Sequence, residues 1–243
     1  MWPAGWTVEH VAVTGSTNRD LLEAAAQLPD RSVRVTDHQT AGKGRLDRRW
    51  DAPPGTNLLV SILFHVVPAR PIDLTRRVAL AAIASCREVA GADVVLKWPN
   101  DLLRDDRKLA GILAEASSGT EGVAYVVLGI GINLRNTAYP PELGDRATSI
   151  ERELGRAADG GRILGELLAA LEERLVRIRE GSSTELLEAW RRLSPSSAGG
   201  AVEFDAPEGR ATGVAAGIDE TGALLVRAGG RVERVIAGEV VWK

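Results

Sequence analysis

The sequence predicts an α+β protein in which helices flank a mixed β-sheet, with a small β-barrel at the C-terminal end. Segments of helical spacing alternate with apolar, β-branched segments over most of the 243 residues. The stretch SPSSAGG interrupts this pattern with proline, serine and glycine. After it, short strand-like segments are separated by glycine-rich turns, which is typical of a small barrel. We therefore expect a large domain over 1–193, a linker over 194–200 and a β-module over 201–243.

Four segments have the apolar spacing of helices, namely 17–28, 73–91, about 161–180 and 184–193. The first begins with a capping-box pattern, because Thr17 is followed three residues later by Asp20. The second ends just before Gly91, a residue type that commonly terminates helices.

Strands are predicted where β-branched and apolar residues dominate: 31–37, 57–67, 93–98, 107–116 and 122–134. The last three follow one another, with the turn RDDR separating the first two of them. Residues 57–67 are apolar over most of their length, which predicts a buried strand.

Composition excludes several classes of protein. The net charge is −3, so bulk electrostatics favour neither nucleic acid nor an acidic membrane, and any anion site must be local. The single cysteine, Cys86, rules out an intramolecular disulfide and a cysteine-rich zinc site. No leader-like N-terminus and no long apolar window are present. We expect a cytoplasmic protein that binds neither membrane nor nucleic acid.

Residues 41–50, AGKGRLDRRW, combine two glycines with four basic side chains. The stretch is not a P-loop, and Asp47 stands where a dinucleotide-binding fingerprint has its third glycine. Gly42 and Gly44 would let backbone N–H groups approach an anion, and four side chains suit phosphate oxygens: Lys43, Arg45, Arg48 and Arg49. Trp50 offers a flat face for stacking. A solvated turn beside a core-facing tryptophan explains the same residues about equally well.

Three further stretches carry candidate binding residues. KWPNDLL ends a strand at Asn100, a residue type common in turns and in nucleotide sites. Strict alternation along RKLAGILAE places Lys108 on the face of Ala110 and on the opposite face from Gly111. GSTN offers hydroxyl and amide groups to a small ligand, although a helix cap explains it as simply.

LGIGINL places Gly129, Gly131 and Asn133 on one strand face. Glycines weaken a strand and usually mark a close approach, so this face suits a flat ligand. Close packing against a helix is the alternative explanation.

Taken in order, the motifs STN, HQTAGKGRLDRRW, KWPNDLL, KLAGILAE and LGIGINL resemble the successive motifs of biotin protein ligases. The helical stretch and β-module that follow resemble the C-terminal portion of that family, so the resemblance extends over nearly the whole chain. It implies a class II synthetase-like catalytic domain over 1–193 and an SH3-like β-barrel over 201–243.

The resemblance implies a ligase that uses ATP, with Mg²⁺ accompanying the nucleotide, to activate biotin as biotinyl-5′-AMP. Pyrophosphate leaves in this first step. The acceptor is one lysine of the carrier domain of a biotin-dependent carboxylase, and AMP leaves in the second step. A homodimer is one outcome that an open sheet edge permits.

The resemblance also implies site residues. Lys108 and Arg45 would be catalytic, and no residue is expected to be a dedicated metal ligand. The biotin site would comprise Ser16, Thr17, Asn18, Gln39, Lys43, Gly44, Arg45, Lys108 and Gly111. The ATP or adenylate site would comprise Arg45, Arg48, Trp50, Asn100, Lys108, Gly129, Gly131 and Asn133.

The loop departs from the family pattern GRGRxGR at two positions. Lys43 keeps the charge of the usual arginine but loses its bidentate fork. Asp47 replaces a glycine and so removes a permissive backbone position while adding a negative charge. Only about fifteen residues precede the STN motif, so we expect no N-terminal DNA-binding domain.

Three rival functions remain. A lipoate or octanoate ligase shares the architecture, but its arginine pair followed by three glycines is absent here. A nucleic-acid-binding module would need a broad basic surface, whereas 201–243 holds seven acidic and five basic residues. A catalytically inactive biotin-binding relative is suggested by Asp47 alone.

Overall fold

Seven strands form one mixed sheet in the computed structural model, which describes residues 2–65, 67–119, 122–176, 183–206, 209–236 and 240–243. The order across this sheet is β1-β2-β3-β7-β6-β5-β4. Only β1 and β2 run parallel, and the other neighbouring pairs are antiparallel. The strands span Thr7–Thr14 (β1), Ser32–Gln39 (β2), Asn57–Phe64 (β3), Val95–Lys97 (β4), Asp101–Arg104 (β5), Arg107–Gly119 (β6) and Gly122–Asn133 (β7).

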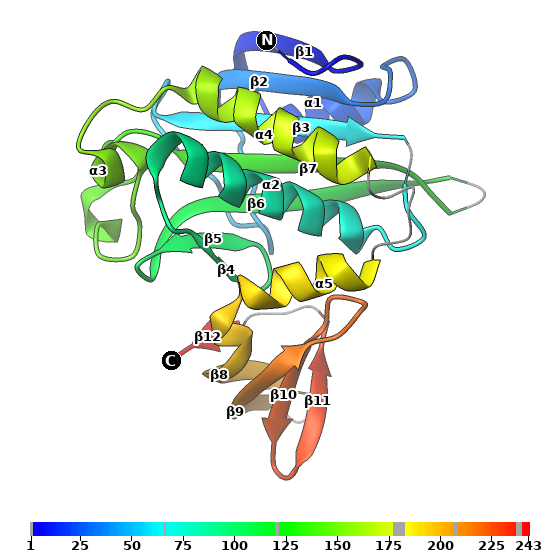
Figure 1. Cartoon of the computed structure of the whole chain (residues 1–243), viewed down its shortest axis with the longest axis vertical. Coiled ribbons are helices and arrows are strands. Elements are labelled where there is room, and N and C mark those ends of the chain that lie inside the picture. Colours follow the sequence, from blue (N-terminus) through cyan, green and yellow to red (C-terminus); the bar gives the residue numbers. More distant parts are fainter. Residues whose placement is uncertain (1, 66, 120–121, 177–182, 207–208, 237–239) are drawn as a thin grey trace.

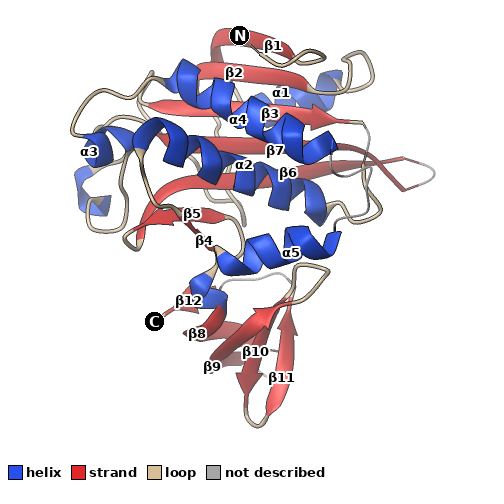
Figure 2. Cartoon of the chain, viewed as in Figure 1, coloured by secondary structure: helices blue, strands red, loops and turns tan. Residues whose placement is uncertain are grey.

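Helices cover both faces of this sheet, as predicted (Figure 1, Figure 2). They span Thr17–Ala24 (α1), Ile72–Ala90 (α2), Ile150–Leu154 (α3), Gly160–Val176 (α4) and Ser183–Arg192 (α5). α2 and α4 pack together over one face, and α1 contacts β3 and β7 on the other. All eight residues of β3 are therefore buried, which confirms the predicted buried strand. None of the described helices is long and apolar enough to cross a membrane.

The four predicted helices are found, although α1 ends at Ala24, four residues before the predicted end, and the predicted capping box is wrong. α1 begins after Ser16, whose side chain makes no capping hydrogen bond. The carboxylate of Asp20 accepts hydrogen bonds from Thr14 Oγ1 at 2.8 and 2.9 Å. Thr17 instead donates through its backbone N to Gln39 Oε1 at 2.9 Å. The third predicted helix, 161–180, corresponds to α4, and its last four residues lie outside the described part of the chain.

The expected series of three strands contains four. Residues 101–104 form a strand of their own, β5, and Asp105 and Asp106 make the turn to β6 with φ of 47° and 60°. β1 and α3 were not predicted. β1 is a mostly exposed edge strand without the apolar run that identified the others. α3 has only five residues, too few to show a helical pattern in the sequence.

The C-terminal part is an antiparallel five-stranded sheet of order β11-β10-β9-β8-β12. Its strands span Ala198–Ala206 (β8), Gly209–Ile218 (β9), Leu224–Ala228 (β10), Arg231–Val235 (β11) and Val240–Trp242 (β12). The predicted antiparallel module is confirmed, but its closure into a barrel is not found. Within the described residues, β12 contributes only three positions, and all three pair with β8. Among the described residues, β12 does not pair with β11, which forms the opposite edge.

Residues 194–200, where the sequence predicts a linker, are partly buried. They contain a 3-10 turn, Pro195–Ser197, and the first residues of β8. Ser194 and Ser197 are buried, and Ser197 Oγ donates to the carbonyl of Ser194 at 2.6 Å. One hydrophobic cluster continues from the large sheet through Trp190 into the C-terminal sheet, so the two parts share a core.

Arg76 of α2 is the charged centre of this junction. Its side chain is 1% exposed. It donates to the carboxylate of Asp73 at 2.8 Å and to the backbone carbonyls of Asp219 and Glu220 at 3.2 and 3.1 Å. In the same β9–β10 turn, the carbonyl of Gly222 accepts a hydrogen bond from Trp98 Nε1 at 2.9 Å. The C-terminal sheet therefore supports the residue that precedes Pro99 and Asn100.

Candidate active site

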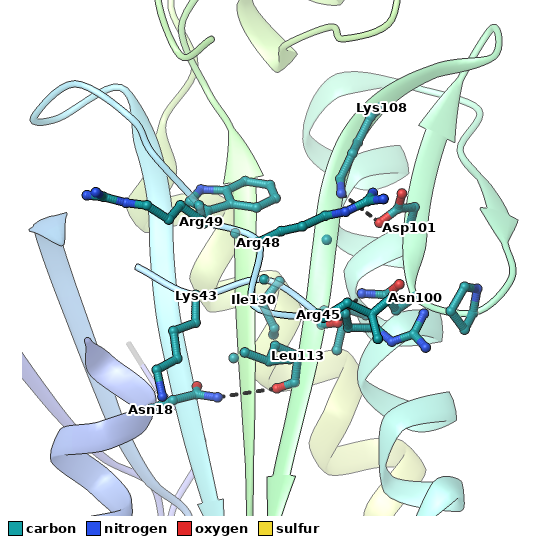
Figure 3. Close-up of a pocket in the computed structure, with 18 of the residues that line it drawn as sticks. Asn18, Lys43, Arg45, Arg48, Arg49, Asn100, Asp101, Lys108, Leu113 and Ile130 are labelled. Carbon is teal, nitrogen blue, oxygen red and sulfur yellow. Dashed lines mark hydrogen bonds and ion pairs between the residues drawn. The ribbon is translucent and has the colours of Figure 1, made fainter. Parts of the chain in front are cut away.

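A cavity of about 260 Å³ lies on the sheet face opposite α2 and α4 (Figure 3). Five separate stretches supply most of its lining: the start of α1, the loop 41–50, the β4–β5 turn, the middle of β6 and the middle of β7. These stretches carry the five sequence motifs, so the fold brings the motifs together at one place. One residue of the C-terminal sheet, Val240, also lines the cavity.

Glycines make the floor of the cavity, and the flat group that they accommodate is a side chain of the protein. A Cβ at Gly131 would lie 2.6 Å from the Trp50 ring, and a Cβ at Gly111 would lie 3.0 Å from it. A Cβ at Gly129 would lie 2.4 Å from Asn18 Oδ1. Close packing therefore explains the glycine face, but only Gly129 packs against a helix, through Asn18 of α1. Gly111 and Gly131 pack against Trp50, which belongs to a loop.

The loop 41–50 folds back on itself as a small hairpin. Lys43 and Arg49 form an antiparallel bridge, and Gly44 N donates to the carbonyl of Arg48. Arg48 N donates to the carbonyl of Arg45 at 3.2 Å and closes a turn whose two central residues are Leu46 and Asp47. Their φ angles of 54° and 57° are both left-handed, as a type I′ hairpin turn requires. Aspartate tolerates this conformation better than most residues, which explains how Asp47 replaces the glycine of the family pattern. Asp47 itself is exposed and is not among the cavity-lining residues.

Lys108 lies beside the aromatic ring of this loop and an acidic partner. Its Nζ is 2.8 Å from Asp101 Oδ1 and 5.3 Å from the centroid of the Trp50 ring. The alternation predicted for this strand is wrong at Lys108. An extra residue, Leu109, bulges the strand, because Leu102 pairs with Ala110 while Leu103 pairs with Lys108. Lys108 consequently shares a face with Gly111 instead of with Ala110.

Side chains from α1, β2 and β3 make a polar wall at the other end of the cavity. Gln39 Oε1 accepts hydrogen bonds from Thr17 N at 2.9 Å and from Thr17 Oγ1 at 3.0 Å. Ser61, which is fully buried, lies 2.6 Å from both Thr17 Oγ1 and Asn18 Oδ1. Asn18 Nδ2 donates to Glu115 Oε2 at 2.7 Å. Such a wall can bind a small polar ring through several directed hydrogen bonds.

Positive charge dominates the lining. Among the described lining residues, Asp101 is the one acid, against six cations: Lys43, Arg45, Arg48, Arg49, Lys97 and Lys108. Burial lowers the pKa of Arg45, while the nearby Asp101 carboxylate opposes this and Arg48 reinforces it. A guanidinium remains charged under such a shift, so Arg45 is a partly desolvated cation whose attraction for an anion is strengthened.

All but one of the residues predicted for the site line this cavity. The exception is Asn133, which lies outside the lining and is buried. Its Nδ2 donates to the carbonyls of Thr148 at 2.9 Å and Lys108 at 3.3 Å, so it supports the backbone at Lys108. Asn100 lines the cavity, but its Nδ2 already donates to the carbonyl of Ile112 at 2.6 Å.

Several residues of the site were not among those predicted. Asp101 and Lys97 lie in a motif that had been singled out, although only Asn100 had been selected from it. Ser61 had a detectable signal, because it is the one hydroxyl in the apolar strand NLLVSILF. Val240 had none, since its place depends on how the C-terminal sheet docks.

Comparisons with known proteins agree with this geometry. Residues 11–133 match the model of the biotin/lipoate A/B protein ligase family, and residues 199–242 match the biotin protein ligase C-terminal domain. The biotin--[acetyl-CoA-carboxylase] ligase of Mycobacterium tuberculosis is 39% identical over 250 aligned positions, covering 98% of this chain and 90% of that protein. The bifunctional ligase/repressor BirA of Escherichia coli is 29% identical, covering 97% and 74%.

Among solved structures, the biotin protein ligase of Aquifex aeolicus in complex with biotin and ATP matches with a TM-score of 0.83 and 26% identity. The match covers 98% of each chain. A family model that spans half of the sequence and a near-full-length relative at 39% identity agree with the motif order and the fold. The chain belongs to the biotin protein ligase family.

Proposed function

We propose that this protein attaches biotin to one lysine of a biotin carboxyl carrier domain in an ATP-dependent reaction. The observation that carries the proposal is the joining, in one cavity, of a polar wall and a cationic loop on a shared glycine floor. Two anions, a carboxylate and a triphosphate, must meet before they can react. Six cations around one acid offset the repulsion between them.

The chemistry proceeds in two steps. The biotin carboxylate oxygen attacks the α-phosphorus of ATP, the bond to the β-phosphate oxygen breaks, and pyrophosphate leaves with its electron pair. The ε-amine of the acceptor lysine then attacks the acyl carbon of biotinyl-5′-AMP. An amide forms, the amine loses a proton, and AMP leaves as the carbonyl-to-phosphate bond breaks. The mixed anhydride must be shielded from water between these steps.

The proposed roles of the residues follow from their positions. Lys108 and Arg45 stabilise the charge that develops on the phosphoryl oxygens, as catalytic residues. Around the biotin we place Ser16, Thr17, Asn18, Gln39, Lys43, Gly44 and Gly111. Around the adenylate we place Arg48, Trp50, Asn100, Gly129 and Gly131, with Asn133 supporting Lys108 from behind.

Mg²⁺ enters this proposal with the nucleotide. The described residues contain no group of three or more acidic, histidine or cysteine side chains that could hold a metal ion. Mg²⁺ in nucleotide sites is commonly held by substrate phosphates and one or two carboxylates, a pattern that Asp101 fits. When bound, the ion screens phosphate charge, while Lys108 and Arg45 act on the reacting oxygens.

The partner follows from the same reasoning, and the other expectations stay predictions. The named ligases act on acetyl-CoA carboxylase, which supports a carboxylase carrier domain as the acceptor here. The division at 193 and 201, a homodimer, the cytoplasmic location and the lack of nucleic-acid or membrane binding are part of the proposal. β1 is an open edge of the sheet, which is where a homodimer would form most simply.

The test is pyrophosphate release by the purified protein with ATP, Mg²⁺ and biotin, lipoate or octanoate in separate reactions. We expect release with biotin alone. Release with lipoate or octanoate in preference to biotin would assign the protein to the rival specificity. No release with any acid from folded protein would leave a binding-only relative.

A further inference from the structure

Glu115 of β6 joins three parts of the site that are far apart in sequence. Its Oε2 accepts a hydrogen bond from Asn18 Nδ2 at 2.7 Å, and its Oε1 lies 4.0 Å from Lys43 Nζ. We propose that Glu115 is a positioning residue that fixes the Asn18 amide and holds Lys43 of the loop against β6. The proposal rests on the proposed function, because the effect assigned to Glu115 is an effect on biotin binding.

The charge of Glu115 determines which way the Asn18 amide faces. An ionised carboxylate only accepts hydrogen bonds, so the NH₂ group of the amide must point toward it. The amide oxygen then faces Ser61 Oγ at 2.6 Å. Asn18 is 4% exposed, so a flipped amide would leave a buried carbonyl against a carboxylate with little water to compensate.

The orientation of Asn18 continues into the polar wall. With the Ser61 proton directed to Asn18 Oδ1, Ser61 Oγ accepts the Thr17 hydroxyl proton across 2.6 Å, and Thr17 donates to Gln39 Oε1 through its backbone N at 2.9 Å. The oxygen of Gln39 is thereby occupied, and its Nε2 faces Gly42, where a Cβ would lie 3.0 Å away. Glu115 is thus the charged end of a chain of hydrogen bonds that fixes which atoms are offered to a ligand.

Packing leaves Asn18 no room to shift toward β7 if Glu115 is changed, so the change left to it is a rotation of its amide in place. A Cβ at Gly129 would lie 2.4 Å from Asn18 Oδ1, so this side chain already touches the backbone of β7. Figure 3 shows Asn18 beside Lys43, with its Nδ2 also 3.4 Å from the carbonyl of Leu113. The Lys43 pair contributes the smaller share, because its atoms are 4.0 Å apart and the lysine is half-exposed.

The first experiment compares E115Q with the matched control E9Q by steady-state pyrophosphate release. E115Q keeps the size of the side chain but removes its charge, so the Asn18 amide is no longer held in one orientation. We expect the KM for biotin to rise about tenfold, with kcat and the KM for ATP changed by less than about threefold. E9Q removes a similar ion pair, Glu9 to Arg34 at 3.1 Å on the distant β1, and should change none of these.

The second experiment exchanges the two partners. In the wild type, Asn18 Nδ2 lies 2.7 Å from Glu115 Oε2, and N18D puts a second carboxylate at this place. Because the two negative charges repel, we expect the KM for biotin to rise about 100-fold. N18D/E115Q restores a donor facing an acceptor with the roles reversed, and should recover about tenfold of that loss. A residue that only fills space would give no recovery. A wild-type KM in E115Q, or no gain in the double variant over N18D, overturns the proposal.

A third readout does not depend on biotin chemistry. Trypsin cleaves after lysine and arginine, so the rate of cleavage within 41–50 measures how firmly this loop is held in the protein without ligands. We expect E115Q to be cut there about two- to fivefold faster than E9Q. Equal rates overturn the anchoring of Lys43. If the wild type releases no pyrophosphate with any acid, the proposed function fails, while this comparison still decides what Glu115 does.

Discussion

Individual residues in this pocket are placed by irregularities of the backbone. Lys108 reaches the cavity because Leu109 bulges β6, and without the bulge its side chain would point to the core with Ala110. Trp50 lies flat on β6 and β7 because Gly111 and Gly131 lack side chains. A lysine ammonium 5.3 Å from the face of a tryptophan is also held by a cation–π interaction. The positions of Lys108 and Trp50 are therefore set by a bulge in β6 and by the lack of side chains at Gly111 and Gly131.

The substitution G131A tests the second of these placements. The new Cβ would lie 2.6 Å from the Trp50 ring, so the ring must move, and we expect a destabilisation of about 1–3 kcal/mol. Thermal unfolding of G131A, W50A and the double variant measures the effect. The G131A cost should largely vanish in the W50A background, because the clash is with that ring. G165A, whose Cβ would lie 3.7 Å from Trp2, serves as the control. Additive effects would show that Gly131 is needed for another reason.

The elements of the fold were largely predictable, and the exceptions have physical causes. Long apolar segments such as β3 and α2 were predicted because buried elements must be apolar. β1 was missed because an edge strand with mostly exposed residues carries little pattern. The pairing of Asp20 with Thr14 instead of with a helix cap depends on where β1 ends, which no local pattern encodes. Most of the site was predictable from motif order, and Ser61 is marked as the one hydroxyl of an apolar strand, whereas the roles of Glu115 and Val240 required the fold.

The hairpin formed by 41–50 depends on two left-handed residues at its tip. L46P cannot adopt the φ of 54°, so we expect the hairpin to be lost and pyrophosphate release to fall by about tenfold or more. D47N tolerates the same conformation without the charge. Because Asp47 is outside the cavity lining, D47N should change kcat/KM by less than about threefold. A large gain in D47N would instead show that the Asp47 charge opposes phosphate binding.

The β9–β10 turn is held by Asp219 and gives a pH-dependent contribution to stability. Partial burial alone raises the pKa of Asp219, but hydrogen bonds from Thr221, Arg234 and Ala223 outweigh this and lower it to about 2. A lowered folded-state pKa stabilises the protein above the unfolded value and loses that effect as the pH falls. D219N should cost about 1 kcal/mol at pH 7, since the ion pair with Arg234 is partly screened. The difference from wild type should fade between about pH 4 and pH 2, and a constant difference would refute it.

The whole molecule works as one unit because the C-terminal sheet is fixed to α2 and to the wall of the pocket. The shared hydrophobic cluster, the Arg76 contacts and the Trp98 hydrogen bond to Gly222 all join the two parts. Val240 brings the C-terminal sheet to the cavity itself. The boundary predicted at 194–200 therefore lies where the two parts contact each other. We expect substitutions that disturb this contact to alter the binding cavity as well.

Removal of Arg76 tests this junction. R76A leaves the buried Asp73 carboxylate without its closest partner and two carbonyls without donors, so we expect a loss of about 3–5 kcal/mol. R87A, which removes an exposed ion pair between Arg87 of the same helix and Asp93 at 3.5 Å, should cost less than about 1 kcal/mol. Denaturant unfolding compares the two. Similar costs for both variants would show that the two sheets do not depend on Arg76 for their docking.

The measurement that tests the central claim most directly is the intact mass of a biotin carboxyl carrier domain after incubation with this protein, ATP, Mg²⁺ and biotin. The account predicts a mass increase of one biotinyl group on a single lysine. In K108A we expect the rate to fall about 100-fold, while K243A, which alters a lysine at the far end of the chain, should match the wild type. An unmodified carrier domain, under conditions in which an authentic biotin protein ligase modifies it fully, would contradict the account.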